Sequence, residues 1–258
     1  FAPDMISARI NAPGPGAEPS SVTVTGINVK HVSKMLLHLP LPGPVADALG
    51  QALPSGQVPE ATLRWRGGLE AFAGGAEGLL AARPEASAVF AGLSVRASRA
   101  GLGAAGWRPG VRNLTGEARV SAEGGSVTLA AADCGVSLPG LFERAETRFD
   151  KLEGAVRWET PADGPPAVRI ESLRLANGDA EAAVRGSWRA TGGAGTIDLT
   201  GDILRARAES VWKYIPLVVA KDAREWLRGG LLGGLASDGK LRLRGRLDDF
   251  QWNAAGQD

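Results

Sequence analysis

The chain has 258 residues, with 29 Lys and Arg against 28 Asp and Glu and a net charge of +1. This balance argues against a nucleic-acid-binding protein, which usually carries a net basic stripe. Hydrophobic residues make up 44% of the chain, which argues against disorder and is enough for a substantial core. The length fits one large β domain or two ordinary ones.

The chain carries a single cysteine, Cys134, so no internal disulfide can form. Cys134 lies in a strand-like stretch, which predicts a small buried hydrophobic residue rather than a reactive thiol. No apolar run approaches the roughly 18 residues of a membrane helix, and no signal peptide precedes the first strand. Because Phe1 begins in mid-pattern, we expect the chain to be a segment of a longer protein whose anchor lies outside it.

Short stretches of alternating apolar and polar residues recur along the chain and predict β-strands. In chain order these stretches are 21–25, 62–66, 93–98, 114–122, 126–129, 156–159, 168–171, 173–175, 180–190, 197–199 and 241–247. Glycine-containing turns such as 123–125 and 177–178 join successive strands tightly. The pattern therefore predicts a mainly β protein, built as an antiparallel meander of a dozen or more short strands.

Two stretches near 44–53 and 206–232 break the strand pattern and predict helical inserts. The first has apolar residues at i, i+4 and i+8, as on one face of a helix: Val45, Leu49 and Leu53. The second is rich in aromatic residues. We expect the inserts to cover an open end or edge of the sheet, with Trp212 and Trp226 packing there.

The sequence lacks the residue clusters that catalysis or metal binding requires. His31 and His38 are the only histidines, and they do not have the spacing of a zinc site. No nucleophile elbow or phosphate-binding loop is present. Asp198 alternates with apolar neighbours, so we interpret it as solvent-facing rather than as a general acid. We therefore expect no enzyme activity, no metal and no cofactor.

Three arginines recur on one face of the last predicted strand, at Arg242, Arg244 and Arg246. A solvated strand face is the simpler interpretation of this basic stripe. Contact with anionic lipid head groups is the alternative.

Residues 205–250 combine an aromatic cluster (Trp212, Tyr214, Pro216), an Arg-Glu-Trp-Leu helix and a long alternating strand ending in Asp-Asp-Phe. In this order the elements resemble the AsmA-like family of bacterial envelope proteins, and within it the YhdP type. Shorter pieces match the same type, so that the resemblance covers most of the chain: 39–42, 63–67, 109–116 and 173–177.

The resemblance implies that residues 1–258 form one continuous segment of a repeating β-groove. Such a groove is an elongated, curved, taco-like antiparallel sheet with short helical segments. The family implies a periplasmic location, with the parent protein anchored in the inner membrane of a Gram-negative bacterium. It also implies phospholipid transport between the inner and outer membranes, a step in outer-membrane biogenesis. The partners would be phospholipid and, through parts of the parent absent here, the membranes. No catalytic motif comes with the family.

In a lipid-carrying groove, the apolar face of the strands would contact the acyl chains. Small residues such as Ala118, Ala130 and Gly186 would leave room for them. The predicted lining residues are Val120, Val127, Leu129, Val156, Trp158, Val168, Ile170, Val184, Trp188, Ile197, Leu199, Leu241 and Leu243. The alternative is a dry β-sandwich core in a carbohydrate-binding or structural interaction module. Only 5% of residues are aromatic, which disfavours a sugar binder.

Overall fold

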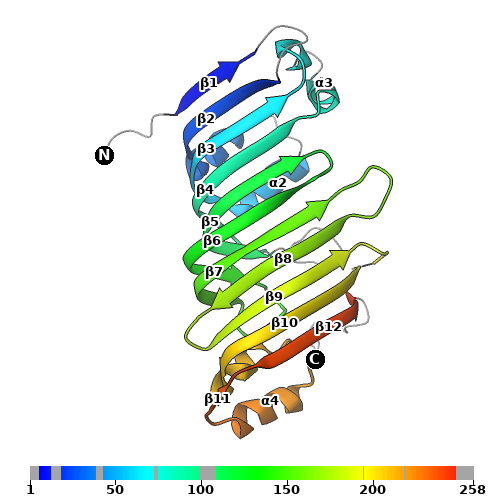
Figure 1. Cartoon of the computed structure of the whole chain (residues 1–258). Helices are drawn as coiled ribbons and strands as arrows, with labels where there is room; N and C mark the ends of the chain where they lie inside the picture. Colours follow the sequence, from blue (N-terminus) through cyan, green and yellow to red (C-terminus); the bar gives the residue numbers. More distant parts are fainter. Residues whose placement is uncertain are drawn as a thin grey trace, which may run out of the picture.

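A computed structural model describes residues 6–12, 19–38, 43–72, 75–98, 109–193, 195–217 and 219–247. In these residues twelve strands form one open antiparallel sheet, ordered β1 to β11 as in the sequence, with β12 also paired to β10 (Figure 1). The predicted mainly β, antiparallel meander is therefore confirmed. The motif pieces at 39–42 and 248–250 lie outside the described residues.

The strands are longer than the alternating stretches that predicted them. Their bounds are β1 (Ser7–Asn11), β2 (Ser20–Asn28), β3 (Ser55–Trp65), β4 (Glu85–Val95), β5 (Gly110–Ser121), β6 (Gly124–Ser137), β7 (Glu146–Glu159), β8 (Ala167–Ala176), β9 (Ala180–Arg189), β10 (Thr196–Arg207), β11 (Leu235–Ala236) and β12 (Gly239–Arg246). Most of the strand residues that were not predicted lie on the far side of a register shift from the predicted stretch. Alternation in the sequence is interrupted at these shifts.

Helices lie in both stretches where inserts were predicted. The first contains α2 (Gly43–Ala52), and the second contains the 3-10 helix η2 (Ala208–Tyr214) and α4 (Lys221–Gly230). Three short helices were not predicted: α1 (Val29–Leu36), η1 (Leu69–Phe72) and α3 (Gly75–Ala81). The available sign of α1 was Asn28, whose side chain caps the helix by accepting a hydrogen bond from the His31 backbone N–H at 3.2 Å.

A line of left-handed residues crosses the sheet and bends its central strands. Gly56, Gly92, Asn113 and Asp133 have φ between +44° and +127° in four neighbouring strands, β3 to β6. The pairing register shifts beside the first three of them, as at β-bulges, which bend strands. The Asn113 side chain holds the bend because its Nδ2 donates to the carbonyl oxygens of Ala132 and Asp133, both at 3.1 Å.

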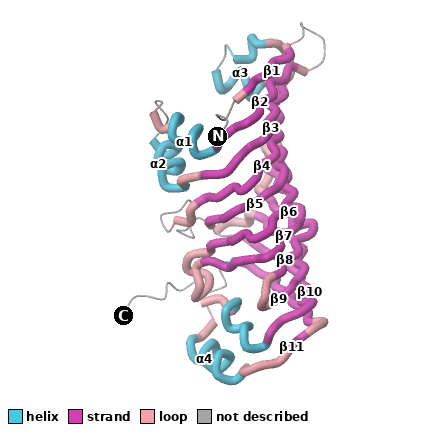
Figure 2. Tube along the Cα trace, turned by 90° about the vertical axis from the view of Figure 1, so that its left-hand side faces the viewer, coloured by secondary structure: helices cyan, strands magenta, loops and turns pink. Residues whose placement is uncertain are grey.

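The bend turns one end of the strands toward the side that carries α1, α2 and α4. Figure 2 shows these helices projecting from the stacked strands, away from the face seen in Figure 1. A buried cluster of apolar residues lies at the bend. Ala131, Cys134 and Leu152 form its centre, surrounded by partly buried apolar side chains of β5 to β8. Cys134 is fully buried, which confirms its prediction, and burial raises the pKa of its thiol.

Candidate functional site

One face of the sheet, here called the apolar face, carries all thirteen predicted lining residues. Strand pairing places them in three lines that cross from β5 to β12. The first line holds Val120, Trp158, Val168, Trp188 and Ile197; the second holds Val127, Val156, Ile170, Leu199 and Leu243; the third holds Leu129, Val184 and Leu241. Whether these side chains contact lipid stays a prediction.

The apolar face is only partly covered. None of the thirteen side chains is buried, and two of them, Val120 and Leu241, are 46% and 58% exposed. The described residues form one sheet, so no second sheet packs over these lines. The alternative of a β-sandwich core is therefore wrong for the described part of the chain.

A fourth line on the same face was missed by the sequence prediction. It joins Ala131, Leu152, Leu175, Ala182 and Ile203 across β6 to β10. It lies toward the bend, where Leu152 is sealed at 3% exposure. Apolar residues every second position from Val156 back to Leu152 were the available indication, but Gly154 interrupts the pattern.

Neighbouring side chains occupy the space beside some of the glycines in these lines. A Cβ at Gly186 would come within 2.9 Å of Leu199 Cδ2, and one at Gly125 within 2.4 Å of Trp158 Cζ2. The large side chains therefore lie flat across adjacent glycines. The expectation that Gly186 leaves room for a guest was wrong, because Leu199 occupies that space. Ala130 pairs with Glu153 and points to the other face.

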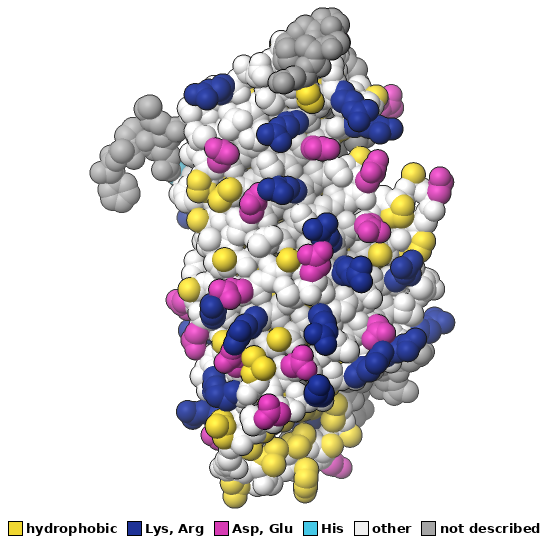
Figure 3. All heavy atoms as spheres, viewed as in Figure 1, with side chains coloured by type: hydrophobic (Ala, Val, Ile, Leu, Met, Phe, Trp, Pro, Cys, Tyr) yellow, Lys and Arg dark blue, Asp and Glu magenta, His cyan; other side chains and the backbone are white. Residues whose placement is uncertain are grey.

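The opposite, charged face presents mixed Lys, Arg, Asp and Glu side chains across most of the sheet (Figure 3). Ion pairs join many of them, such as Arg119 to Glu117 at 2.7 Å and Arg157 to Glu171 at 2.6 Å. Asp198 faces this side, as predicted, and accepts contacts from Arg242 at 3.4 Å and Arg244 at 3.7 Å. Two arginines of the predicted basic stripe thus share one carboxylate of the protein itself.

Asp179, in the turn between β8 and β9, fastens the helical insert to the sheet. It accepts hydrogen bonds from Ser210 at 2.8 Å, Lys213 at 2.7 Å and Tyr214 at 3.4 Å. Burial acts to raise the pKa of Asp179, but these hydrogen bonds and the Lys213 charge outweigh it, so that the pKa lies below its ordinary 3.8. Burial, together with the nearby Asp179 charge, raises the pKa of Tyr214.

Ser210 and Lys213 share the Ser-x-x-Lys spacing of some acyl-transfer enzymes. In this protein the Ser210 hydroxyl donates to Asp179, and the Lys213 ammonium is ion-paired with the same carboxylate. A serine nucleophile needs a base that can accept its proton, and this arrangement does not direct the serine proton to Lys213. The contacts give the cluster a structural role.

The two tryptophans of the insert have different environments. Trp212 lies under Arg228, whose guanidinium carbon is 3.9 Å from the ring centroid, and Arg228 also pairs with Glu143 at 2.8 Å. Trp226 is 70% exposed, so the expectation that it packs was wrong. Leu232 and Leu235, which follow α4 in the chain, are also exposed. Figure 3 shows an apolar region at the lower end of the molecule, where Figure 1 places α4 and β11.

The described residues hold no group of three His, Cys, Asp or Glu side chains arranged as a metal site. None of the helices in the described ranges is long and apolar enough to cross a membrane. The feature that remains as a candidate site is the apolar face, an extended surface without reactive groups.

A sequence model of the YhdP protein family matches residues 5–256. The chain belongs to the YhdP family. This result confirms the resemblance drawn from residues 205–250 and the shorter motifs. YhdP proteins are bacterial envelope proteins, and membership indicates a role in lipid transport. Searches of curated proteins and of solved structures found no match to the chain.

Proposed function

We propose that the apolar face binds the acyl chains of phospholipids and lets them move along the sheet between the inner and outer membranes. The observation that carries the proposal is the set of three apolar lines from β5 to β12, none of whose thirteen predicted residues is buried. Large, contiguous apolar surfaces on soluble proteins usually mark a site that a ligand or partner covers.

The energetics suit movement without an external energy source. Each methylene group kept from water contributes about 0.8 kcal/mol. An acyl chain that leaves a bilayer for the apolar face stays in apolar surroundings, so the transfer is close to isoenergetic. Lipid head groups would remain in water outside the lines of apolar side chains.

The proposal places the protein in the periplasm of a Gram-negative bacterium, as part of a longer parent protein. There the sheet would act as one continuous groove segment, and the bend at β3 to β6 would supply its curvature. The bend turns strand ends toward the side that carries α1, α2 and α4 (Figure 2), which supports a concave apolar side.

Photocrosslinking tests the proposal on neighbouring residues that face opposite ways. Benzoylphenylalanine would replace Leu129 on the apolar face or Thr128 on the charged face of β6. After irradiation in a bacterial envelope, mass spectrometry should find phospholipid adducts at position 129 and few at position 128. Equal adducts at both positions, or none at either, would contradict the proposal.

A further inference from the structure

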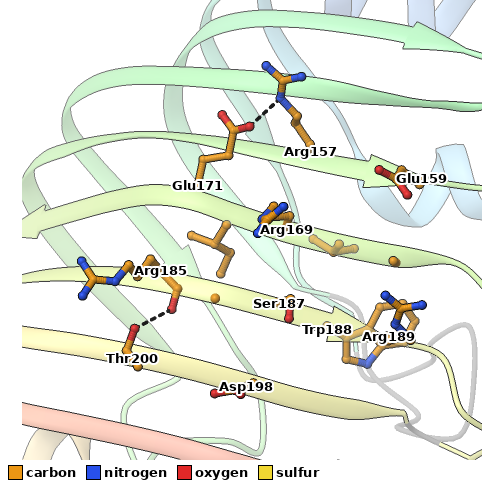
Figure 4. A pocket seen from close by; sticks show the side chains of 14 residues that line it. Arg157, Glu159, Arg169, Glu171, Arg185, Ser187, Trp188, Arg189, Asp198 and Thr200 are labelled. Atoms are coloured by element: carbon orange, nitrogen blue, oxygen red, sulfur yellow. Dashed lines mark hydrogen bonds and ion pairs between the residues drawn. The ribbon is translucent and has the colours of Figure 1, made fainter.

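Three arginines neighbour one serine on the charged face, away from the proposed lipid surface. Arg185 and Arg189 flank Ser187 along β9, and Arg169 of β8 pairs directly opposite Ser187. The Cα atoms of residues two apart on a strand are about 6.6 Å from each other, and the Cα atoms of directly paired residues are about 5 Å apart. Figure 4 shows the four residues lining a common depression of about 700 Å³.

These three arginines are not neutralised by the protein. The depression also contains Arg157, which pairs with Glu171, and Asp198, which lies directly opposite Ser187 on β10 and pairs with Arg242 and Arg244. Arg169, Arg185 and Arg189 make no ion pair within the described residues. Glu159, at the rim of the depression, is the acid that remains there. The site therefore holds an excess of positive charge in a chain whose net charge is only +1.

A second depression on the same face shows how the protein balances charge elsewhere. It lies over β3 to β7 and has a volume of about 570 Å³. Its Arg119 is paired with Glu117, and its Arg64 lies directly opposite Glu85. Like charges placed close together on a sheet are destabilising. The three arginines at Ser187 thus carry a cost that an anion would relieve.

We propose that Arg169, Arg185 and Arg189, together with the Ser187 hydroxyl, bind the phosphate group of a phosphate-bearing ligand. A guanidinium group donates two parallel hydrogen bonds to phosphate oxygens, which a point charge cannot do. A phosphate has enough oxygens to accept from all three arginines and from the serine. All four side chains are exposed, so binding depends strongly on salt concentration.

The site is independent of the proposed lipid transport because it lies on the opposite face from Trp188 and Ile197. Its ligand can therefore be sought with the chain alone. Inorganic phosphate is the first probe, with chloride at equal ionic strength as the reference. A ligand that binds only the folded state raises the unfolding temperature in a saturable manner, so phosphate should do so and chloride should not.

The test variant is Arg169→Gln, Arg185→Gln and Arg189→Gln combined, which should lower phosphate affinity at least tenfold. The matched control is Arg9→Gln, Arg64→Gln and Arg119→Gln, which removes the same charge from the same face. The control should keep the wild-type affinity within about twofold. Equal losses in both variants would overturn the site, because they would report net charge alone.

Single substitutions make the result independent of how the triple variant folds. Arg185→Gln and Ser187→Ala should each lower phosphate affinity about three- to tenfold, and Arg185→Lys should not restore it fully. An unchanged affinity in all three would overturn the proposal.

Vesicles identify the source of the phosphate group. Phosphatidylcholine vesicles with and without phosphatidylglycerol would be tested for sedimentation with the chain. If the wild-type chain binds the anionic vesicles and the triple variant does not, the source is a lipid head group. Saturable binding of inorganic phosphate without vesicle binding supports a soluble ligand. The absence of both responses overturns the proposal.

Discussion

The apolar and charged faces of the sheet are made by alternate residues of the same strands. The two faces differ in how far their side chains are paired or covered by the protein itself. On the charged face, ion pairs such as Arg157–Glu171 and Arg174–Glu181 join neighbouring strands. On the apolar face, side chains contact one another but none of the thirteen predicted lining residues is buried. The difference indicates that the charged side chains are stabilised largely by one another and by water, whereas the apolar face keeps apolar area in contact with water. Under the proposed function, a ligand would cover that area.

The largest effect should come from the sealed part of the apolar face. Leu152→Ala removes a side chain that is 3% exposed and should lower the free energy of unfolding by about 2–5 kcal/mol. Leu241→Ala, at 58% exposure, should cost less than about 1 kcal/mol. Urea unfolding of the lipid-free chain measures both. Similar costs at the two sites would show that the apolar face is covered evenly by protein.

Adjacent residues of β9 give a direct comparison of the two faces. Val184→Arg places a charge in the third apolar line, whereas Ala183→Arg places it on the charged face between Arg174 and Asp202. Under the proposed function, Val184→Arg should reduce co-purified phospholipid about tenfold, because a guanidinium disfavours acyl chains, and Ala183→Arg should leave it unchanged. Mass spectrometry of extracted lipid provides the measurement. Similar lipid contents would mean that the assignment of faces to function is wrong.

Acid should loosen the helical insert before it affects the apolar face. Because the Asp179 pKa is lowered in the folded protein, its charge stabilises the fold above the ordinary value near 3.8. That stabilisation is lost as the pH falls through the folded pKa. Asp179→Asn should cost about 1 kcal/mol at pH 7 and less at pH 3, below the ordinary pKa of 3.8. Unfolding curves at both pH values test this, and an equal cost at both would exclude the charge as the cause.

The smallest effect should come from an exposed pair on the charged face. Arg157→Ala should lower the free energy of unfolding by less than about 1 kcal/mol, since exposed ion pairs contribute little. The cost should decrease further in high salt. Double-mutant cycles with Glu171→Ala measure the coupling. A large, salt-insensitive coupling would mean that the charged face stabilises the fold more than the apolar contacts do.

Sequence patterns could predict the faces because side chains alternate strictly along a strand. The period of two in 114–122 and 180–190 predicted which residues share a side, and strand pairing then joined them into lines. The bend could not be predicted, because it depends on left-handed residues that meet only when β3 to β6 pair, and Asn113 and Asp133 do not require that conformation by type.

Two expectations were wrong for reasons of local packing. Trp226 was expected to be covered because large apolar residues usually are, but α4 leaves it in solvent. Gly186 was expected to leave space, but Leu199 fills it. The arginine cluster was partly visible in the sequence as Arg185-x-Ser187-x-Arg189. The contribution of Arg169 depends on the register between β8 and β9, which no single-strand pattern reveals.

Because the strands follow one another in the sheet as they do in the chain, each added hairpin would lengthen the sheet by a fixed amount. Each strand from β1 to β11 pairs with the next one in the chain, so one further hairpin would lengthen the sheet by about 10 Å. Such a hairpin could be gained or lost in evolution while the registers on either side are kept, since within the described ranges the strands from β1 to β9 pair only with their neighbours in the chain. The reach of the molecule can thus change in steps, with its cross-section preserved.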